Sequence, residues 1–412
     1  MLARKLFIFP ASLFLILFSL GKFLLADGIG MLEDLDLPRG AEKKTAYYEI
    51  LSAVPAKEPG WLQFRVAAPH AEYEVEGVQG LLKLLHEITV IEKIRRREMG
   101  SGFEEGVEDS VKATGRGFAR LVSHPVESGK GIKTAAGKLG RGFGGVFRRK
   151  EKGESSSFGE KLLGGSEREL AKEFQVDVYT ANPHLRKLLR DMAKARMGGK
   201  GAVTVGKILL PVAGLASVAL TASGVNAAAD QVVNDSSRGE LFSLNKEALL
   251  KLGFEESLVR SFLNLPYYSP REATYVRFYL EKMKGVEGSG QVLEKSAKAE
   301  SLWAARKILY TLQIAAERMS PSEPYARMEW TPEGLGLQTG ETTVLILPYD
   351  DLELSGRSAE VLDQAADLRK SWGSQKSSIW NAGKIPAVFS VQAGLRGVKT
   401  RDCLLWDKNV SA

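Results

Sequence analysis

Residues 112–152 form a basic, glycine-spaced stretch that separates the amino-terminal part of the chain from the rest. The stretch holds eleven Lys and Arg residues against only two acids, Glu127 and Glu151, which is a local surplus of nine positive charges. The complete chain of 412 residues carries a net charge of only +7, so without this stretch it is slightly acidic. We therefore expect the interaction surface of the protein to lie here.

One phrase occurs twice in the stretch, as Gly115-Arg116-Gly117-Phe118 and as Gly140-Arg141-Gly142-Phe143. Apolar residues at helical spacing follow in two blocks, which His124-Pro125 separates because proline removes a helical donor and restricts the residue before it. The pattern predicts two short amphipathic pieces with phenylalanines at an acyl boundary and basic groups at phosphates. The residues expected to contact a membrane or an anion are Arg116, Phe118, Arg120, Lys130, Lys133, Lys138, Arg141, Phe143, Phe147, Arg148 and Arg149.

Two other interpretations of the stretch remain open. Each glycine weakens a helix by about 1 kcal/mol relative to alanine, which fits a segment that becomes ordered on a surface. The same glycines also fit close backbone packing against another helix, or a flexible basic linker that ends near Glu154-Ser155-Ser156-Ser157.

One segment of the stretch has a known parallel. It reads Gly117-Phe118-Ala119-Arg120-Leu121-Val122-Ser123-His124-Pro125-Val126-Glu127 and continues with Gly129, Gly131, Gly137 and the second Gly-Arg-Gly-Phe phrase. It resembles the glycine-rich amphipathic region near the carboxyl end of chorein-type lipid-transfer proteins. That region contacts membranes, so the resemblance implies membrane contact by residues 115–147. Ser128 stands where glycine is usual, and nothing resembles the long lipid-carrying groove, so lipid transfer is not implied. More broadly, the chain resembles uncharacterised exported bacterial proteins.

Residues 1–26 are typical of a secretory signal peptide. Arg4 and Lys5 precede an apolar run from Leu6 to Phe18, and a cut after Ala26 is plausible. An uncleaved amino-terminal anchor is the alternative. Either way we expect an exported protein of the periplasm or cell envelope. Outside the cytoplasm, an anionic lipid or an envelope polymer is a better partner for basic charge than nucleic acid, and an acidic envelope protein is a further option.

The sequence offers little for enzymatic chemistry, and we expect no cofactor, nucleotide or metal. The four histidines are scattered without ligand spacing, and Ser128-Gly129-Lys130-Gly131 lacks the first glycine and the Ser/Thr of a phosphate loop. Asp350-Asp351 follows a predicted strand and is the one candidate for catalysis, as a hydrolase of phosphate or glycan substrates. The single cysteine, Cys403, excludes an internal disulfide and has the apolar neighbours of a packed thiol.

The periodicity predicts an α+β fold in which helix predominates. We expect five parts: the signal (1–26), a small β-sheet with an amphipathic helix (27–100), the basic segment and linker (101–165), a helical bundle (166–325) and a carboxyl-terminal α+β unit (326–412). The first sheet comes from 47–51, 61–66 and 73–76, and the last from 328–337, 342–347 and 386–391 around a helix over 358–372.

Several helices have clear signals. One apolar helical face consists of Leu81, Leu84, Leu85, Ile88, Ile91 and Ile94. A second helix is expected to begin at Asn182-Pro183 and to end at Gly198-Gly199. Asn245 is expected to cap a short helix ending at Gly253, a capping box opens another at Ser269, and 292–319 has a single helical period. The uncharged run 208–225 is either a buried core helix or a membrane span, and the basic residues before it favour the core helix if the signal is cleaved.

Overall fold

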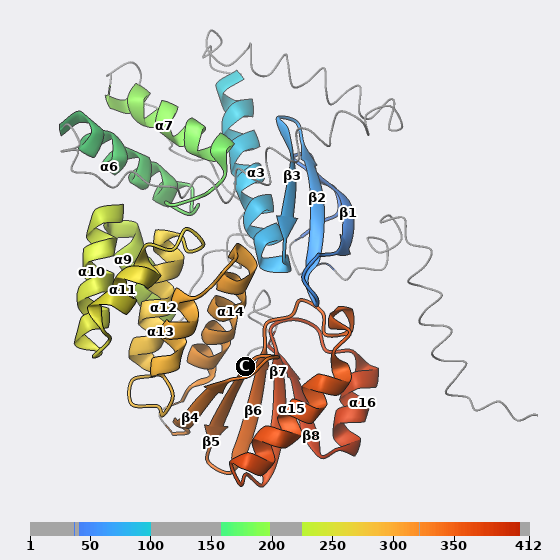
Figure 1. Ribbon diagram of the computed structural model, residues 1–412. Coiled ribbons are helices and arrows are strands. Elements are labelled where there is room, and N and C mark those ends of the chain that lie inside the picture. Colours follow the sequence, from blue (N-terminus) through green and yellow to red (C-terminus); the bar gives the residue numbers. More distant parts are fainter. Residues whose placement is uncertain (1–36, 38–40, 100–157, 198–224, 321, 404–412) are drawn as a thin grey trace, which may run out of the picture.

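The computed structural model describes residues 37, 41–99, 158–197, 225–320 and 322–403 (Figure 1). These ranges contain eleven α-helices, one sheet of three strands and a second sheet of five strands. The predicted α+β fold with a predominance of helix is therefore confirmed. The signal peptide, the basic stretch and nearly all of 208–225 lie outside the described residues.

The smaller sheet is an antiparallel meander in the order β1-β2-β3, formed by Glu49–Pro55, Leu62–Ala68 and Ala71–Glu76. The long helix α3 (Val78–Met99) follows it directly and packs against β2 and β3. All six residues of the predicted apolar face of α3 are buried, so that face covers the sheet and continues into the core beyond it.

Helices α6 (Phe158–Glu173) and α7 (Pro183–Met197) form a pair that packs on α3 (Figure 1). The predicted start of α7 is confirmed, because the Asn182 side-chain oxygen accepts a hydrogen bond from the backbone N–H of His184 at 3.1 Å. Leu185, Leu189 and Met192 of α7 are buried with Ile91 and Ile94 of α3 in one cluster. The two helices therefore stand on the half of α3 that extends past the small sheet.

Six helices build the central bundle, and two of them begin differently from our expectation. The capping box at Ser269 is confirmed, with Pro270 as the first helical residue. Asn245, in contrast, is not a cap: Ser237 caps α10, and Asn245 lies buried inside the helix, donating to the Thr274 hydroxyl at 2.9 Å. The expected single helix over 292–319 is divided, because Ser301 caps a new helix. The bundle consists of α9 (Val225–Asp235), α10 (Arg238–Lys251), α11 (Glu256–Leu263), α12 (Pro270–Lys282), α13 (Gly290–Ala297) and α14 (Leu302–Arg318).

The five-stranded sheet has the order β4-β5-β6-β7-β8, antiparallel from β4 to β6 and parallel from β6 to β8. The predicted strand over 328–337 is two strands, since Thr331–Gly334 form a turn between them. Gly334 approaches the Ile346 carbonyl so closely that a Cβ atom would stand 1.9 Å from its oxygen. The strands are β4 (Tyr325–Trp330), β5 (Leu335–Thr339), β6 (Thr342–Leu347), β7 (Lys376–Asn381) and β8 (Val398–Asp402).

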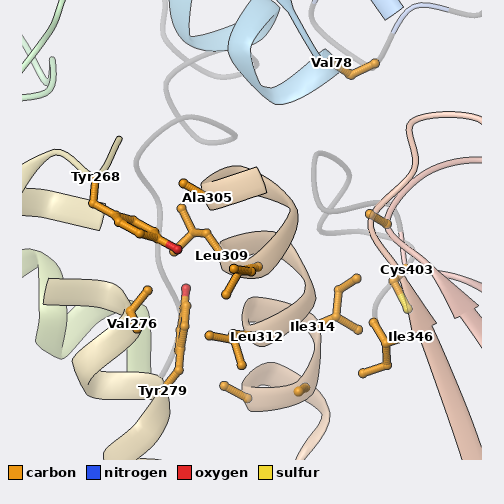
Figure 2. Packing of buried hydrophobic residues seen from close by; sticks show 14 of the residues in the cluster. Val78, Tyr268, Val276, Tyr279, Ala305, Leu309, Leu312, Ile314, Ile346 and Cys403 are labelled. Atoms are coloured by element: carbon orange, nitrogen blue, oxygen red, sulfur yellow. The ribbon is translucent and has the colours of Figure 1, made fainter. Parts of the chain in front are cut away.

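Both faces of this sheet are covered. Val344 and Ile346 belong to the same core cluster as α14, whereas Leu345 and Leu347 on the opposite face pack with α15 (Ser358–Ser371). Figure 2 shows how α14 joins the two parts: Leu309 and Leu312 lie toward the bundle, and Ile314 lies toward the sheet near Ile346. The helix therefore stands between the bundle and the sheet.

The predicted strand over 386–391 is wrong, because that segment forms α16 (Ala387–Leu395). The segment is short and rich in Val and Phe, which favours a strand, but proline at position 386 donates no hydrogen bond and precedes the helix as its cap. Phe389 and Ala393, one helical turn apart, face the sheet, while Val388 and Val391 are exposed. The outer strand is instead β8, which the sequence pattern did not indicate.

Candidate functional site

The eleven residues expected to contact an anionic surface lie between positions 116 and 149, outside the described residues. The geometry of that surface therefore stays a prediction. The described part of the chain contains three polar clusters and one carboxylate pair that could serve a function, and each has a distinct electrostatic character.

Asp350 joins the carboxyl-terminal sheet to the amino-terminal part of the molecule. Its Oδ1 accepts the backbone N–H of Val78, the first residue of α3, at 3.1 Å, and its Oδ2 accepts that of Leu62 at 3.0 Å. Asp351 turns away, accepting the N–H of Glu353 at 2.8 Å. Both oxygens of Asp350 are therefore occupied by backbone donors, and the pair caps local structure.

Burial raises the pKa of Asp350 to about 7, although the two backbone N–H groups favour the ionised form. No cation forms an ion pair with this carboxylate among the described residues, so its desolvation is only partly compensated. A raised pKa in an enclosed position suits a general acid only if substrate can reach it. The backbone of Leu62 and Val78 lies next to the carboxylate, and the Gly60 carbonyl accepts the backbone N–H of Asp350 at 2.9 Å.

A second cluster is a buried ion network around the turn that follows α6. Asp177 accepts a hydrogen bond from the Lys83 ammonium at 2.5 Å and lies 3.9 Å from the guanidinium of Arg271, which also contacts Asp230. Burial alone would raise the pKa of Asp177, but the two cations outweigh it and lower that pKa to about 2. The network is internally neutralised and links α3, α9 and α12.

A third cluster brings together two histidines that are far apart in the sequence. One ring nitrogen of His70 lies 2.6 Å from the Glu92 carboxylate and the other lies 2.5 Å from the Tyr73 hydroxyl. The His184 ring stands 5.1 Å from that of His70. Burial lowers the pKa of His184 to about 4, with a further contribution from His70, Arg95 and Lys187. These groups satisfy one another inside the junction of β3, α3 and α7.

The fourth feature is a cavity of about 220 Å³ between α6, α7 and the start of α10. Three arginines line it, Arg168 from α6, Arg186 from α7 and Arg238 from α10, together with Tyr179 from the turn between α6 and α7. The Tyr179 hydroxyl is fixed by donating to the Ser236 carbonyl at 2.5 Å. Val178 and Leu189 supply apolar wall, and Gly164 leaves room beside Arg168.

The three guanidinium groups of this arginine pocket form no ion pair with any carboxylate among the described residues. Glu167 also lines the cavity, but its carboxylate is 3.5 Å from Arg190. Desolvation lowers the pKa of Arg238, and repulsion from Arg186 lowers it further. Guanidinium groups that repel each other across a concave surface are an arrangement suited to an anion.

Sequence reasoning did not find the arginine pocket or the histidine cluster. The pocket residues stand on three helices whose exposed faces carry many ordinary basic residues, so no spacing distinguishes them. The histidines were interpreted as scattered, which is true of the sequence but not of the fold for His70 and His184. The only available signal was the polar 177–180 segment between two amphipathic helices.

Three further observations concern the described residues alone. Cys403 is buried, and burial raises the pKa of its thiol to about 11, which is unfavourable for a nucleophile. Across the described ranges, no group of three or more His, Cys, Asp or Glu side chains is arranged to hold a metal ion. Among the described helices, none has both the length and the apolar character needed for a bilayer crossing.

No protein-family model matches the chain, and neither the curated proteins nor the solved structures contain a significant match to it.

Proposed function

We propose that the protein is an exported, non-enzymatic component of the cell envelope that contacts an anionic membrane or envelope polymer through residues 112–152. The observation that carries this proposal is the surplus of nine positive charges in that stretch, in a chain that is otherwise slightly acidic. Phenylalanines at helical spacing add an apolar component suited to a bilayer interface.

The described fold adds support from the residues that follow the stretch. Helix α6 begins at Phe158, six positions after Lys152, and α6 and α7 present Arg168 and Arg186 without carboxylate partners among the described residues. The two helices that follow the stretch thus carry guanidinium groups without carboxylate partners among the described residues, although α6 by itself is not basic, with four Glu against three Lys and Arg residues.

The geometry offers less support for a hydrolase. Asp350 is buried with both oxygens bonded to backbone N–H groups, and Asp351 closes a short turn. Neither residue lines the arginine pocket. Because the Asp350 carboxylate is buried and holds two backbone N–H groups, and Asp351 holds a third, the pair is better explained as a structural cap.

Vesicle sedimentation tests the proposal. The full chain should sediment with vesicles that contain phosphatidylglycerol and not with vesicles of phosphatidylcholine alone. Changing Lys130, Lys133, Lys138 and Arg141 to Gln removes four contacts of about 1 kcal/mol each, so binding should weaken by at least tenfold. A control with Lys284, Lys295, Lys376 and Lys399 changed to Gln loses the same charge from exposed positions elsewhere and should bind like the wild type.

Equal binding by the two quadruple variants would contradict the proposal, because charge in general and not this stretch would then be responsible. Capture of an acidic envelope protein that persists in detergent, without vesicle binding, would identify a protein-docking scaffold instead. The export part is tested by sequencing the amino terminus of the protein purified from its own cells, which should begin at Asp27.

A further inference from the structure

The arginine pocket is defined here by Arg168, Arg186, Arg238 and Tyr179, which surround the cavity of about 220 Å³ between α6, α7 and α10. It is separate in the chain from residues 112–152 and is built entirely from described residues. Its three guanidinium groups have neither a hydrogen bond nor an ion pair to another described residue. Arg186 and Arg238 are exposed and Arg168 is half-buried, so a solute can reach all three residues.

The charge inside the pocket indicates the charge of its ligand. Three guanidinium groups and the single carboxylate of Glu167 line the cavity, and that carboxylate already has Arg190 at 3.5 Å. Counted over its lining residues alone, the cavity carries a net charge of +2, which a dianion neutralises; the Glu240 carboxylate, which interacts with Arg168, is not part of the lining. A phosphomonoester carries a charge of about −1.5 to −2 at pH 7 and presents three oxygens to the forked donors of arginine.

The remaining wall indicates that the ligand has an organic part. Val178 and Leu189 are apolar, and the Tyr179 ring is held in place because its hydroxyl donates to the Ser236 carbonyl. A water molecule takes about 30 Å³ of liquid volume, so the cavity of about 220 Å³ has the volume of several water molecules. That is more than one phosphate group needs. A small apolar or polyol portion can therefore lie against this wall while the phosphate contacts the arginines.

We propose that the arginine pocket is a binding site for the terminal phosphate of a phosphomonoester with a small organic portion. The phosphate lies between the guanidinium groups of Arg168, Arg186 and Arg238, and the organic portion contacts Tyr179 and Leu189. This site goes beyond the proposed contact of residues 112–152 with an anionic surface and does not require that contact.

Two kinds of molecule carry such a terminal phosphate: a soluble phosphomonoester, and a lipid whose headgroup is a phosphomonoester, such as phosphatidic acid. Titration calorimetry on the full chain with glycerol 3-phosphate tests the soluble source, with glycerol as the uncharged comparison. Sedimentation with vesicles containing phosphatidic acid, compared with phosphatidylglycerol vesicles, tests the lipid source. Binding in either arm supports the proposal only if it depends on the pocket.

Dependence on the pocket is measured with a matched pair of variants. A Cβ atom at Gly164 would lie 3.8 Å from the Arg168 guanidinium, whereas a Cβ atom at Gly165 would meet nothing within 4 Å. G164E therefore places a carboxylate beside the pocket, where it competes with the ligand, and G165E adds the same charge to the next residue of the same helix. We expect G164E to weaken binding at least tenfold and G165E to leave it nearly unchanged.

The double variant R168Q/R238Q provides the second measurement, because removing two charge-assisted contacts should weaken binding by at least a hundredfold. Thermal unfolding of each variant confirms that the fold is intact. Binding of glycerol 3-phosphate or phosphatidic acid vesicles that is the same in wild type, G164E and R168Q/R238Q would overturn the proposal. So would the absence of any pocket-dependent binding in both arms.

The two proposals fail separately. The quadruple Gln variant of residues 130–141 should lose phosphatidylglycerol vesicles and keep pocket-dependent binding, whereas G164E should do the reverse.

Discussion

Two cationic clusters lie on either side of the turn at residues 177–180, and they differ in what neutralises them. Lys83 and Arg271 enclose Asp177, which is 3% exposed and whose pKa is about 2. Arg168 and Arg238 face a cavity and have no carboxylate partner among the described residues. The same short turn contributes Asp177 to the first cluster and Tyr179 to the second.

The difference follows from desolvation. A charge that is removed from water must be paired inside the protein, since an unpaired buried charge costs several kcal/mol. An arginine at the edge of a cavity keeps part of its hydration and can remain unpaired until a ligand arrives. The paired network of Asp177 therefore stabilises the fold, whereas the unpaired arginines of the pocket are available for binding. Substitutions in the two clusters should differ accordingly in their effect on stability.

The largest effect is expected for D177N, which leaves Lys83 and Arg271 without their shared carboxylate. Breaking a buried ion pair in this way should lower the free energy of unfolding by about 3–5 kcal/mol, measured by denaturant titration at pH 7. D235N is the control, because the Asp235 carboxylate is 61% exposed beside Lys172 and should contribute at most about 1 kcal/mol. Equal losses in the two variants would show that the network of Asp177 is not structural.

The next effect concerns Asp350, a buried carboxylate that forms no ion pair with a described residue. Its pKa is about 7 in the folded protein and 3.8 ordinarily, so between these values the folded state holds a proton that the unfolded state has released. The free energy of unfolding should therefore fall as the pH rises from about 4 to 7, by up to about 1.4 kcal/mol per pH unit from this group. D350N should remove that fall while costing about 1–3 kcal/mol at pH 5, where one backbone N–H loses its acceptor.

A contribution of opposite sign is expected from His184. Burial and nearby cations lower its pKa from 6.5 to about 4, so the unfolded state binds a proton in this window and the folded state does not. Stability from this group is present above about pH 6.5 and is lost as the pH falls toward 4. When the pH is lowered from 7 to 5, denaturant titrations should show that H184Q loses less free energy of unfolding than the wild type, or gains more, because only the opposing contribution of Asp350 remains. The same change in both proteins would contradict this assignment.

The smallest effect is expected in the arginine pocket itself. R238Q removes a guanidinium that has no carboxylate partner among the described residues and is repelled by Arg186. Its unfolding free energy should stay within about 0.5 kcal/mol of the wild type. R271Q, which removes a cation from the buried network, should be much less stable. A loss in R238Q as large as that in R271Q would contradict the distinction between the two clusters.

Local signals in the sequence were sufficient for much of the fold. The Asn182 cap of α7 and the capping box at Ser269 were predicted from residues within one helical turn, and the apolar face of α3 from the period of that one segment. These features depend on side-chain periodicity and on hydrogen bonds to nearby backbone groups, which are properties of the segment itself.

Segments whose local pattern suited two structures were less predictable. Residues 386–391 have the Val and Phe content of a strand but form α16, because the neighbouring position in the sheet is taken by β8 and the helix can bury Phe389. Asn245 has the chemistry of a cap, yet Ser237 lies where the helix begins. In both cases tertiary packing outweighed the local preference.

By itself, the sequence determined several of the helices, most of the strands and the concentration of positive charge in residues 112–152. Only the tertiary structure decided which charged groups became neighbours: Lys83 meets Asp177 across 94 positions, and Asp350 meets Val78 across 272. Helical periods and caps operate over a few residues of chain. Pairing and desolvation depend instead on which surfaces the complete fold brings together, so the paired network and the open arginine pocket have no signature along the chain.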